Sequence, residues 1–170
     1  MATRTDLQER FGELLEQHRR IVFKVANTYC WHPEDRADLA QEICAQLWRA
    51  FPAYDPARSF STWMYRIALN VAISSVRSSR RRDRHTVPFD ADVHDVPHDT
   101  GGVIEADERI RTLYRVINQL DDLNRALLLL YLDEHSYREI ADILGISETN
   151  VATKLGRLKQ RLRTDIGNAS

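Results

Sequence analysis

The segment FSTWMYRIALNVAISSVR, residues 60–77, decides the fold, because its apolar residues recur at helical spacing. That period predicts an amphipathic helix with one buried stripe. The predicted stripe consists of Phe60, Trp63, Met64, Ile67, Ala68 and Val71. The opposite face then carries Ser61, Thr62, Tyr65, Arg66, Asn70, Ile73 and Arg77.

The predicted outward face combines a cation, an amide and an aromatic ring. These groups grip a phosphate, read a base edge and stack on a base. Tyr65 is the better stacking candidate, since Trp63 falls on the buried stripe. A run of basic side chains follows directly: Arg77, Arg80, Arg81, Arg82 and Arg84. An ordinary surface helix with a solvated basic end has the same periodicity, so this pattern alone leaves both interpretations open.

Composition limits the classes of protein that remain. The chain has 170 residues, 43% of them hydrophobic, which suffices for one domain or two small ones without metals or disulfides. A formal net charge of −1 excludes a generic polycation. No apolar run approaches the ~20 residues of a membrane span, so we expect a cytoplasmic protein without membrane insertion. In that reducing compartment Cys30 and Cys44 are predicted to be buried core thiols, not a redox switch or metal ligands.

Two further helices are predicted before residue 51. The first spans residues 7–29 on a 3.6-residue period, with His18 at the surface or half-buried. The second starts at Pro33, where a missing N–H costs nothing, and runs to about Ala50. Its outward face is acidic and amide-bearing, although a merely solvated face has the same pattern: Asp35, Asp38, Gln41 and Glu42. Residues 51–59 contain two prolines and are predicted to form a loop.

The composition changes sharply between residues 85 and 108. This stretch has seven acidic residues and no lysine or arginine, and its prolines and glycines break any helix. It is therefore predicted to be a flexible acidic linker between residues 1–84 and residues 109–170. Its histidines are irregularly spaced, which favours solvated side chains over a metal site: His85, His94 and His98.

The last third of the chain predicts further helices. An amphipathic helix covers residues 110–120, and Asp121 or Asp122 caps the next one, whose residues 127–132 are nearly all apolar. The segment SYREIADILGISETNVATKLGRLKQRLR, residues 136–163, then predicts a helix, a tight turn and a second helix.

Three features of this segment define the turn. Ser136 with Glu139 forms a capping box, Gly145 is a left-handed stop, and Ser147 caps the second helix. Residues 154–163 contain five basic residues and no acid. These features favour a DNA-binding helix-turn-helix, with a helical hairpin inside a bundle as the alternative.

Two motifs in this order, DLAQEICAQLWRAF (residues 38–51) and SFSTWMYRIALNVA (residues 59–72), resemble the bacterial sigma-70 family in its extracytoplasmic-function (ECF) group. The resemblance implies an all-α protein with two small domains. Residues 1–84 would bind core RNA polymerase and the minus-ten promoter element, and residues 109–170 would read the minus-thirty-five element. The implied partners are the clamp coiled coil of the polymerase β′ subunit, the β flap, promoter DNA and an anti-sigma factor, with no cofactor.

The resemblance also assigns residues to each surface. Core polymerase would be bound by Asp35, Asp38, Gln41 and Glu42. The minus-ten element would be bound by Ser59, Ser61, Thr62, Tyr65, Arg66, Asn70 and Arg77, with a flipped base held between the 51–59 loop and Asn70. The minus-thirty-five element would be bound by Ser147, Thr149, Asn150, Thr153, Lys154 and Arg157. Members of the family often have basic residues where this chain has Ser61, Leu69 and Ala152, and Gly156 lies in the middle of a predicted helix.

We therefore expect an RNA polymerase sigma factor that directs core polymerase to promoters and assists their opening. The alternative is a stand-alone helix-turn-helix repressor, which would leave residues 38–42 and 60–77 without a role. No catalytic constellation is evident, so an enzyme that uses the linker histidines is a distant third.

Overall fold

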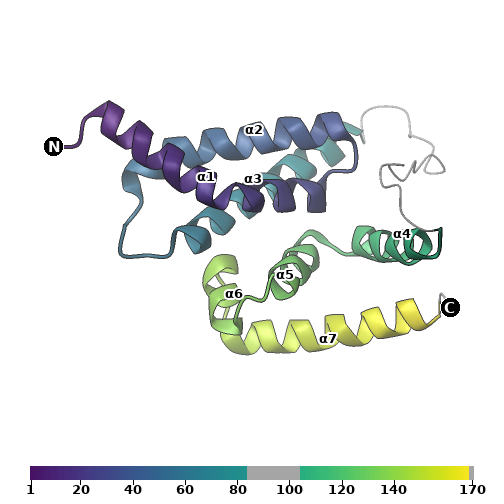
Figure 1. Cartoon of the computed structure of the whole chain (residues 1–170). Coiled ribbons are helices and arrows are strands. Elements are labelled where there is room, and N and C mark those ends of the chain that lie inside the picture. The colour runs from purple at the N-terminus through teal and green to yellow at the C-terminus, as the bar shows by residue number, and fades with distance from the viewer. Residues whose placement is uncertain (84–103, 169–170) are drawn as a thin grey trace. The chain divides into compact units, whose positions relative to one another are not determined.

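The computed structural model describes residues 1–83 and 104–168, and throughout these ranges the secondary structure is helical, without strands (Figure 1). The chain divides into two compact units, Met1–Ala91 and Asp92–Ser170. The predicted all-α architecture is confirmed. His85, His94 and His98 lie outside the described residues. No helix in the described ranges is long and apolar enough to cross a membrane.

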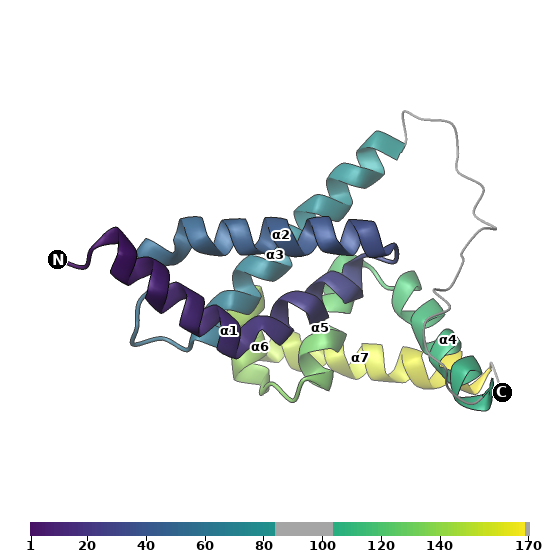
Figure 2. The same ribbon diagram turned by 45° about the horizontal axis from the view of Figure 1, so that its top comes forward.

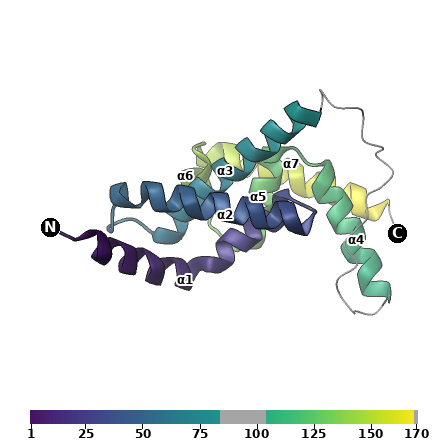
Figure 3. The same ribbon diagram turned by 90° about the horizontal axis from the view of Figure 1, so that it is seen from above.

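The first unit contains helices α1 (Arg4–Tyr29), α2 (Pro33–Ala50) and α3 (Phe60–Asp83), and a short 3₁₀ turn, η1 (Phe51–Ala53), follows α2. Each of the three α-helices packs against the other two, as the turned views show (Figures 2 and 3). Their apolar stripes meet in a common core, in which the most deeply buried side chains are Val25, Ile43, Leu47, Met64 and Ala68.

Helix α1 begins three residues before the predicted start, because Thr3 caps it. The backbone N–H of Asp6 donates to Oγ1 of Thr3 at 3.2 Å, and the N–H of Thr3 donates to Oδ2 of Asp6 at 2.9 Å. This reciprocal pair satisfies two helix-terminal donors. The bond from the Thr3 backbone also holds the pKa of Asp6 below its usual value.

The cysteines are less enclosed than predicted. Cys30 ends α1 and Cys44 lies on α2, and both side chains are half-buried instead of fully buried. These two cysteines form no disulfide. Partial burial raises the pKa of the Cys44 thiol, which keeps it protonated at neutral pH.

The second unit contains α4 (Ile104–Gln119), α5 (Asp122–Leu132), α6 (Tyr137–Leu144) and α7 (Glu148–Gly167). Helix α4 thus begins inside the range predicted as linker, residues 85–108. Helices α4, α5 and α6 all pack against α7. The apolar run of α5 is largely enclosed, as predicted, although Leu132 at its end is exposed. The core of the unit is formed by Leu127, Leu130, Ile140, Val151 and Leu155.

A buried arginine closes the C-terminal end of α4. Arg125 lies on α5 with only 7% of its surface exposed. Its Nε donates to the carbonyls of Ile117 and Leu120, both at 3.2 Å, and Nη2 donates to the carbonyl of Asn118 at 2.9 Å. Carbonyls at a helix end have no partner within the helix, so this side chain both satisfies them and docks α4 onto α5.

Candidate nucleic-acid interface

Helix α3 presents a narrow polar stripe to the outside of the first unit. Arg66, Asn70 and Arg77 are all exposed, and their spacing of four and seven residues places them on one helix face. This is where the sequence placed them. A long cation, an amide and a second cation therefore follow one another along about three turns of the helix.

The prediction for Tyr65 was wrong. Tyr65 is 1% exposed and Leu69 is 2% exposed, so both belong to the buried face of α3. Trp63, predicted to be buried, is half-buried instead. The core side of α3 is thus displaced around the helix relative to the predicted stripe: Phe60, Met64, Tyr65, Ala68, Leu69 and Ala72.

The displacement follows from the number of neighbours that α3 has. It packs against α1 and α2 at the same time, so it buries a broad band instead of a single seam. Leu69 occupies a position where the family often has a basic residue, and here it contributes to the core. Since Tyr65 is enclosed in the same band, it cannot stack on a base while α3 keeps this packing.

An aromatic cluster joins the loop after α2 to the start of α3. The ring centroids of Tyr54 and Trp63 lie 5.0 Å apart, those of Tyr54 and Phe60 lie 5.4 Å apart, and those of Phe51 and Trp63 lie 6.2 Å apart. His18 of α1 approaches Phe60 at 5.0 Å. The sequence analysis did not single out this cluster, although four aromatic residues close to two prolines were a visible signal. Of these rings, Tyr54 and Trp63 are only half-buried.

The loop itself is held in shape by its own polar groups. The hydroxyl of Tyr54 donates to the carbonyl of Arg58 at 2.7 Å, and Oδ1 of Asp55 accepts from the N–H of Ala57 at 3.0 Å. A backbone bond of 3.0 Å from the N–H of Arg58 to the carbonyl of Asp55 closes the turn. The loop therefore has a defined conformation next to α3.

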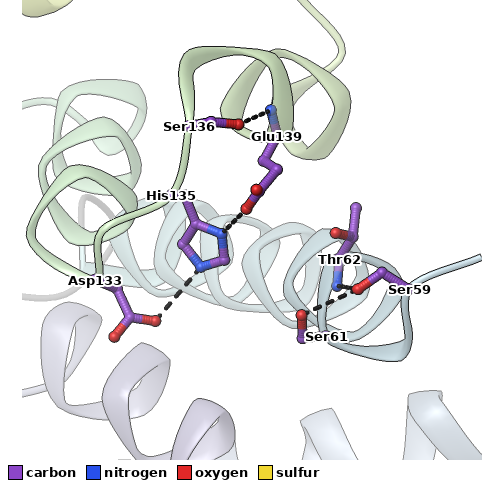
Figure 4. Close-up of polar contacts among 7 residues, drawn as sticks. All are labelled: Ser59, Ser61, Thr62, Asp133, His135, Ser136 and Glu139. Carbon is purple, nitrogen blue, oxygen red and sulfur yellow. Dashed lines mark hydrogen bonds and ion pairs between the residues drawn. The ribbon is translucent and has the colours of Figure 1, made fainter.

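Ser59 ends this loop and caps α3. Its Oγ accepts from the N–H of Thr62 at 3.4 Å and lies 3.2 Å from Oγ of Ser61, as Figure 4 shows. Ser59 is exposed, and Ser61 and Thr62 are half-buried. The structure thus brings three of the predicted minus-ten residues together at the N-terminal end of α3, where the helix dipole favours anions.

The predicted polymerase-binding residues share an exposed face of α2. Asp35, Asp38, Gln41 and Glu42 are all exposed, while their neighbours Leu39 and Ile43 are buried. Oε1 of Glu42 accepts a hydrogen bond from the side chain of Gln46 at 3.2 Å. The four predicted residues are therefore accessible on the surface of the unit.

The second unit has the predicted helix-turn-helix. Gly145 adopts a left-handed conformation with φ of 70° at the end of α6. Oγ of Ser147 then accepts from the N–H of Asn150 at 3.1 Å and caps α7. The first turns of α7 carry the predicted minus-thirty-five residues. Among them Thr149, Asn150, Thr153 and Arg157 are exposed, and Lys154 is half-buried.

The predicted capping box at α6 is only half formed. Oγ of Ser136 accepts from the N–H of Glu139 at 3.1 Å, but the Glu139 carboxylate contacts a different group. Oε2 of Glu139 lies 2.8 Å from Nδ1 of His135, and Oδ2 of Asp133 lies 3.4 Å from Nε2 of the same ring (Figure 4). His135 thereby links the end of α5 to the start of α6. Because its two nitrogens face different carboxylates, these three residues do not converge on a common point.

Metal chemistry has no support in the described parts of the chain. Within residues 1–83 and 104–168 no group of three or more histidine, cysteine, aspartate or glutamate side chains could hold a metal ion.

Comparison with known proteins matches both units. The family model described as Sigma-70 region 2 matches residues 14–82, and the model described as Sigma-70, region 4, matches residues 110–162. The chain is 28% identical to the ECF RNA polymerase sigma factor SigW of Bacillus subtilis, over 94% of this chain and 90% of SigW. It is 27% identical to the ECF RNA polymerase sigma-E factor of Escherichia coli K12, over 91% of this chain and 85% of that protein.

Solved structures show the same fold. CnrH, in complex with the cytosolic domain of CnrY, aligns over 96% of this chain and 91% of its own with a TM-score of 0.70 and 22% identity. The sigma factor RpoE of Bartonella quintana, in complex with the anti-sigma factor NepR, aligns over 95% of this chain and 97% of its own with a TM-score of 0.69 and 18% identity.

A three-helix unit that matches Sigma-70 region 2 is followed by a helix-turn-helix unit that matches Sigma-70, region 4, so the chain belongs to the sigma-70 family of transcription initiation factors. Within that family it is an ECF-type RNA polymerase sigma factor, which has no enzymatic activity of its own. The alternative of a stand-alone repressor is not supported.

The burial of Tyr65 has a measurable consequence. Replacing Tyr65 by Ala should lower the free energy of unfolding by about 3–5 kcal/mol, because a large enclosed ring is removed from the core. Replacing its exposed neighbour Arg66 by Ala should change stability by less than about 0.5 kcal/mol. Urea denaturation followed by tryptophan fluorescence measures both, since all three tryptophans lie in residues 1–83: Trp31, Trp48 and Trp63. Equal effects of the two substitutions would contradict the orientation described for α3.

Proposed function

We propose that the exposed stripe of α3, together with the loop before it, captures the unpaired minus-ten element. What supports this is the arrangement at one end of the first unit. Ser59, Ser61 and Thr62 surround the N-terminal end of α3, and Arg66 and Asn70 follow on its outer face. The three hydroxyl side chains can contact backbone phosphate. The Asn70 amide can both donate to and accept from a base edge.

Capture of a base explains how such a protein assists promoter opening. Extruding one base from a duplex costs a few kcal/mol. A sigma factor lowers that cost only if it binds the open state more tightly than the closed duplex. Asn70 contributes to this difference, because a base edge is accessible to it only after unpairing. Because Tyr65 is enclosed, the rings that stack on the base are the half-buried ones of the aromatic cluster, Tyr54 and Trp63.

The acidic face of α2 is proposed to bind core polymerase at the clamp coiled coil of the β′ subunit. Asp35, Asp38, Gln41 and Glu42 offer carboxylate and amide oxygens from one side of one helix. Arginine-rich helices pair with such a face through bidentate hydrogen bonds, which fix orientation as well as adding attraction. The second unit is proposed to read the minus-thirty-five element with the start of α7 and to contact the β flap.

Two further proposals concern the regulator of the protein and its location in the cell. An anti-sigma factor is the proposed regulator, and a fold shared with a sigma factor solved in complex with the anti-sigma factor NepR supports this. The proposed location is the cytoplasm, where core polymerase and promoters are found.

The minus-ten assignment predicts a specific defect for Asn70→Ala. Run-off transcription from a duplex promoter should fall roughly tenfold, the equivalent of one good hydrogen bond to a base. On a template that is already unpaired at the minus-ten element the defect should shrink, because no base pair has to be opened. Ser74→Ala, an exposed position one turn further along α3, is the matched control. Full activity of Asn70→Ala on the duplex promoter would rule out this contact.

The polymerase assignment predicts a loss of binding on charge reversal. Asp38→Lys combined with Glu42→Lys should weaken association with core polymerase by at least roughly tenfold, because like charges then face each other across the interface. Glu9→Lys with Glu13→Lys has the same spacing on the exposed side of α1 and should leave the affinity within about twofold. Titration of labelled chain with core polymerase by fluorescence anisotropy measures both. If the two double variants behaved alike, α2 would not be the docking face.

The minus-thirty-five assignment predicts a change in salt dependence. Lys154→Ala combined with Arg157→Ala should weaken holoenzyme binding to promoter DNA. It should also reduce the slope of log K against log salt by roughly two, because each phosphate contact contributes about 0.9. Binding is measured between about 50 and 200 mM salt. A lower affinity with an unaltered slope would show that these cations do not neutralise phosphates.

A further inference from the structure

Lys159 lies where three helices of the second unit meet. It is on α7, and its Nζ sits 4.3 Å from the ring centroid of Tyr131, which belongs to α5. The same ammonium donates to the hydroxyl of Tyr137, the first residue of α6, at 3.5 Å. Each tyrosine is 38% exposed, so the contact is at the surface of the unit and not in its core.

These contacts favour the charged form of the lysine. A positive charge over the face of an aromatic ring is attracted by the ring quadrupole, and a phenolic oxygen accepts from it. The Tyr131 side chain, and after it Tyr137, raises the pKa of Lys159 above its usual value.

Four of the five basic residues of α7 fall into two groups by their contacts, and the fifth, Arg163, lies near the end of the helix. Lys159 is held by two tyrosines, and Nε of Arg161 lies 3.6 Å from Oδ2 of Asp165. Lys154 and Arg157, by contrast, have no hydrogen bond or ion pair with any residue in the described ranges. Both also lie nearer the capped end of α7. The resemblance assigned only Lys154 and Arg157 to the minus-thirty-five surface, and the contacts of Lys159 and Arg161 with side chains were not predicted.

A small tilt of α7 at Lys159 would displace the side chains at the start of the helix. Asn150 precedes it by nine residues, which corresponds to about 14 Å along the helix axis. A tilt of α7 by about 10° around the Lys159 contact would move the Asn150 side chain by about 2 Å, enough to break a hydrogen bond to a base. The buried side chains of Val151, Leu155 and Leu158 also resist such a tilt, and the Lys159 contact adds to them at the surface.

We propose that Lys159 is a positioning residue for promoter recognition and not a phosphate contact. Through Tyr131 and Tyr137 it fixes the orientation of α7 relative to α5 and α6, and so the placement of Thr149, Asn150 and Thr153. This inference rests on the proposed reading of the minus-thirty-five element by α7.

The experiment compares Lys159→Met, which keeps the length of the side chain and removes its charge, with Lys159→Arg. Holoenzyme binding to duplex promoter DNA is measured as a function of salt. Lys159→Met should weaken binding roughly two- to fivefold, in proportion to one exposed cation–π contact. The slope of log K against log salt should stay unchanged, because no phosphate contact is lost. Lys159→Arg should retain wild-type affinity, since a guanidinium also stacks on an aromatic ring.

Arg157→Ala is the matched comparison on the same helix, and it should reduce the salt slope by about one. A decrease of that size for Lys159→Met, or unchanged affinity for it, would overturn the positioning role. Weakened binding by Lys159→Arg would also overturn the positioning role.

A second measurement addresses the contact without DNA. In the full chain the ε-methylene protons of Lys159 should resonate upfield of those of Lys154, because they are bonded next to the ammonium that lies over the Tyr131 ring, and Tyr131→Leu should abolish the difference. Absence of the upfield shift would refute the contact itself. An intact shift with a holoenzyme that ignores the minus-thirty-five sequence would instead refute the proposed function.

Discussion

Helix α3 buries a broad band of its surface because it packs against both α1 and α2. Only a narrow outer strip is left for polar groups, and Arg66, Asn70 and Arg77 lie within it. The same packing supports the strip from beneath, since Met64 and Ala68 on the opposite side of the helix are completely enclosed. The site proposed to hold an unpaired base would gain from such support, because little ordering would remain to be done when the base arrives. The loop before α3 is stabilised in a similar way, by its aromatic rings and its internal hydrogen bonds.

The second unit obtains its geometry from polar groups at helix ends. Arg125 closes α4, Asp121 caps α5, Ser136 caps α6 and Ser147 caps α7. These bonds set where α4 ends and where α5, α6 and α7 start, and the apolar core sets how the helices pack. His135 and Lys159 then add contacts between neighbouring helices. The resulting unit presents the start of α7 with its threonines and asparagine outward.

Much of this could be predicted from sequence, because helix periods and caps are local. The helix-turn-helix, the acidic face of α2 and the stripe of α3 all follow from spacing. The orientation of Tyr65 could not be predicted from spacing, because tyrosine occurs both in cores and on surfaces. It is buried here because α3 packs against a second helix. The contacts of the Glu139 carboxylate and of Lys159 likewise could not be predicted, because they involve side chains outside the helix that carries each of them. The exact roles of the proposed binding residues lie beyond any local pattern, because they involve a partner.

The left-handed glycine between α6 and α7 has a consequence for how promoter preference can evolve. An added methyl group at Gly145 would meet nothing within 4 Å, so crowding does not restrict this position. The restriction is the backbone conformation itself, which costs other residues about 1 kcal/mol or more. The angle between the two helices is therefore hard to alter by single mutations. If α7 reads the minus-thirty-five element as proposed, new target sequences would arise most readily by exchange of the outward side chains of α7, with the turn at Gly145 kept unchanged.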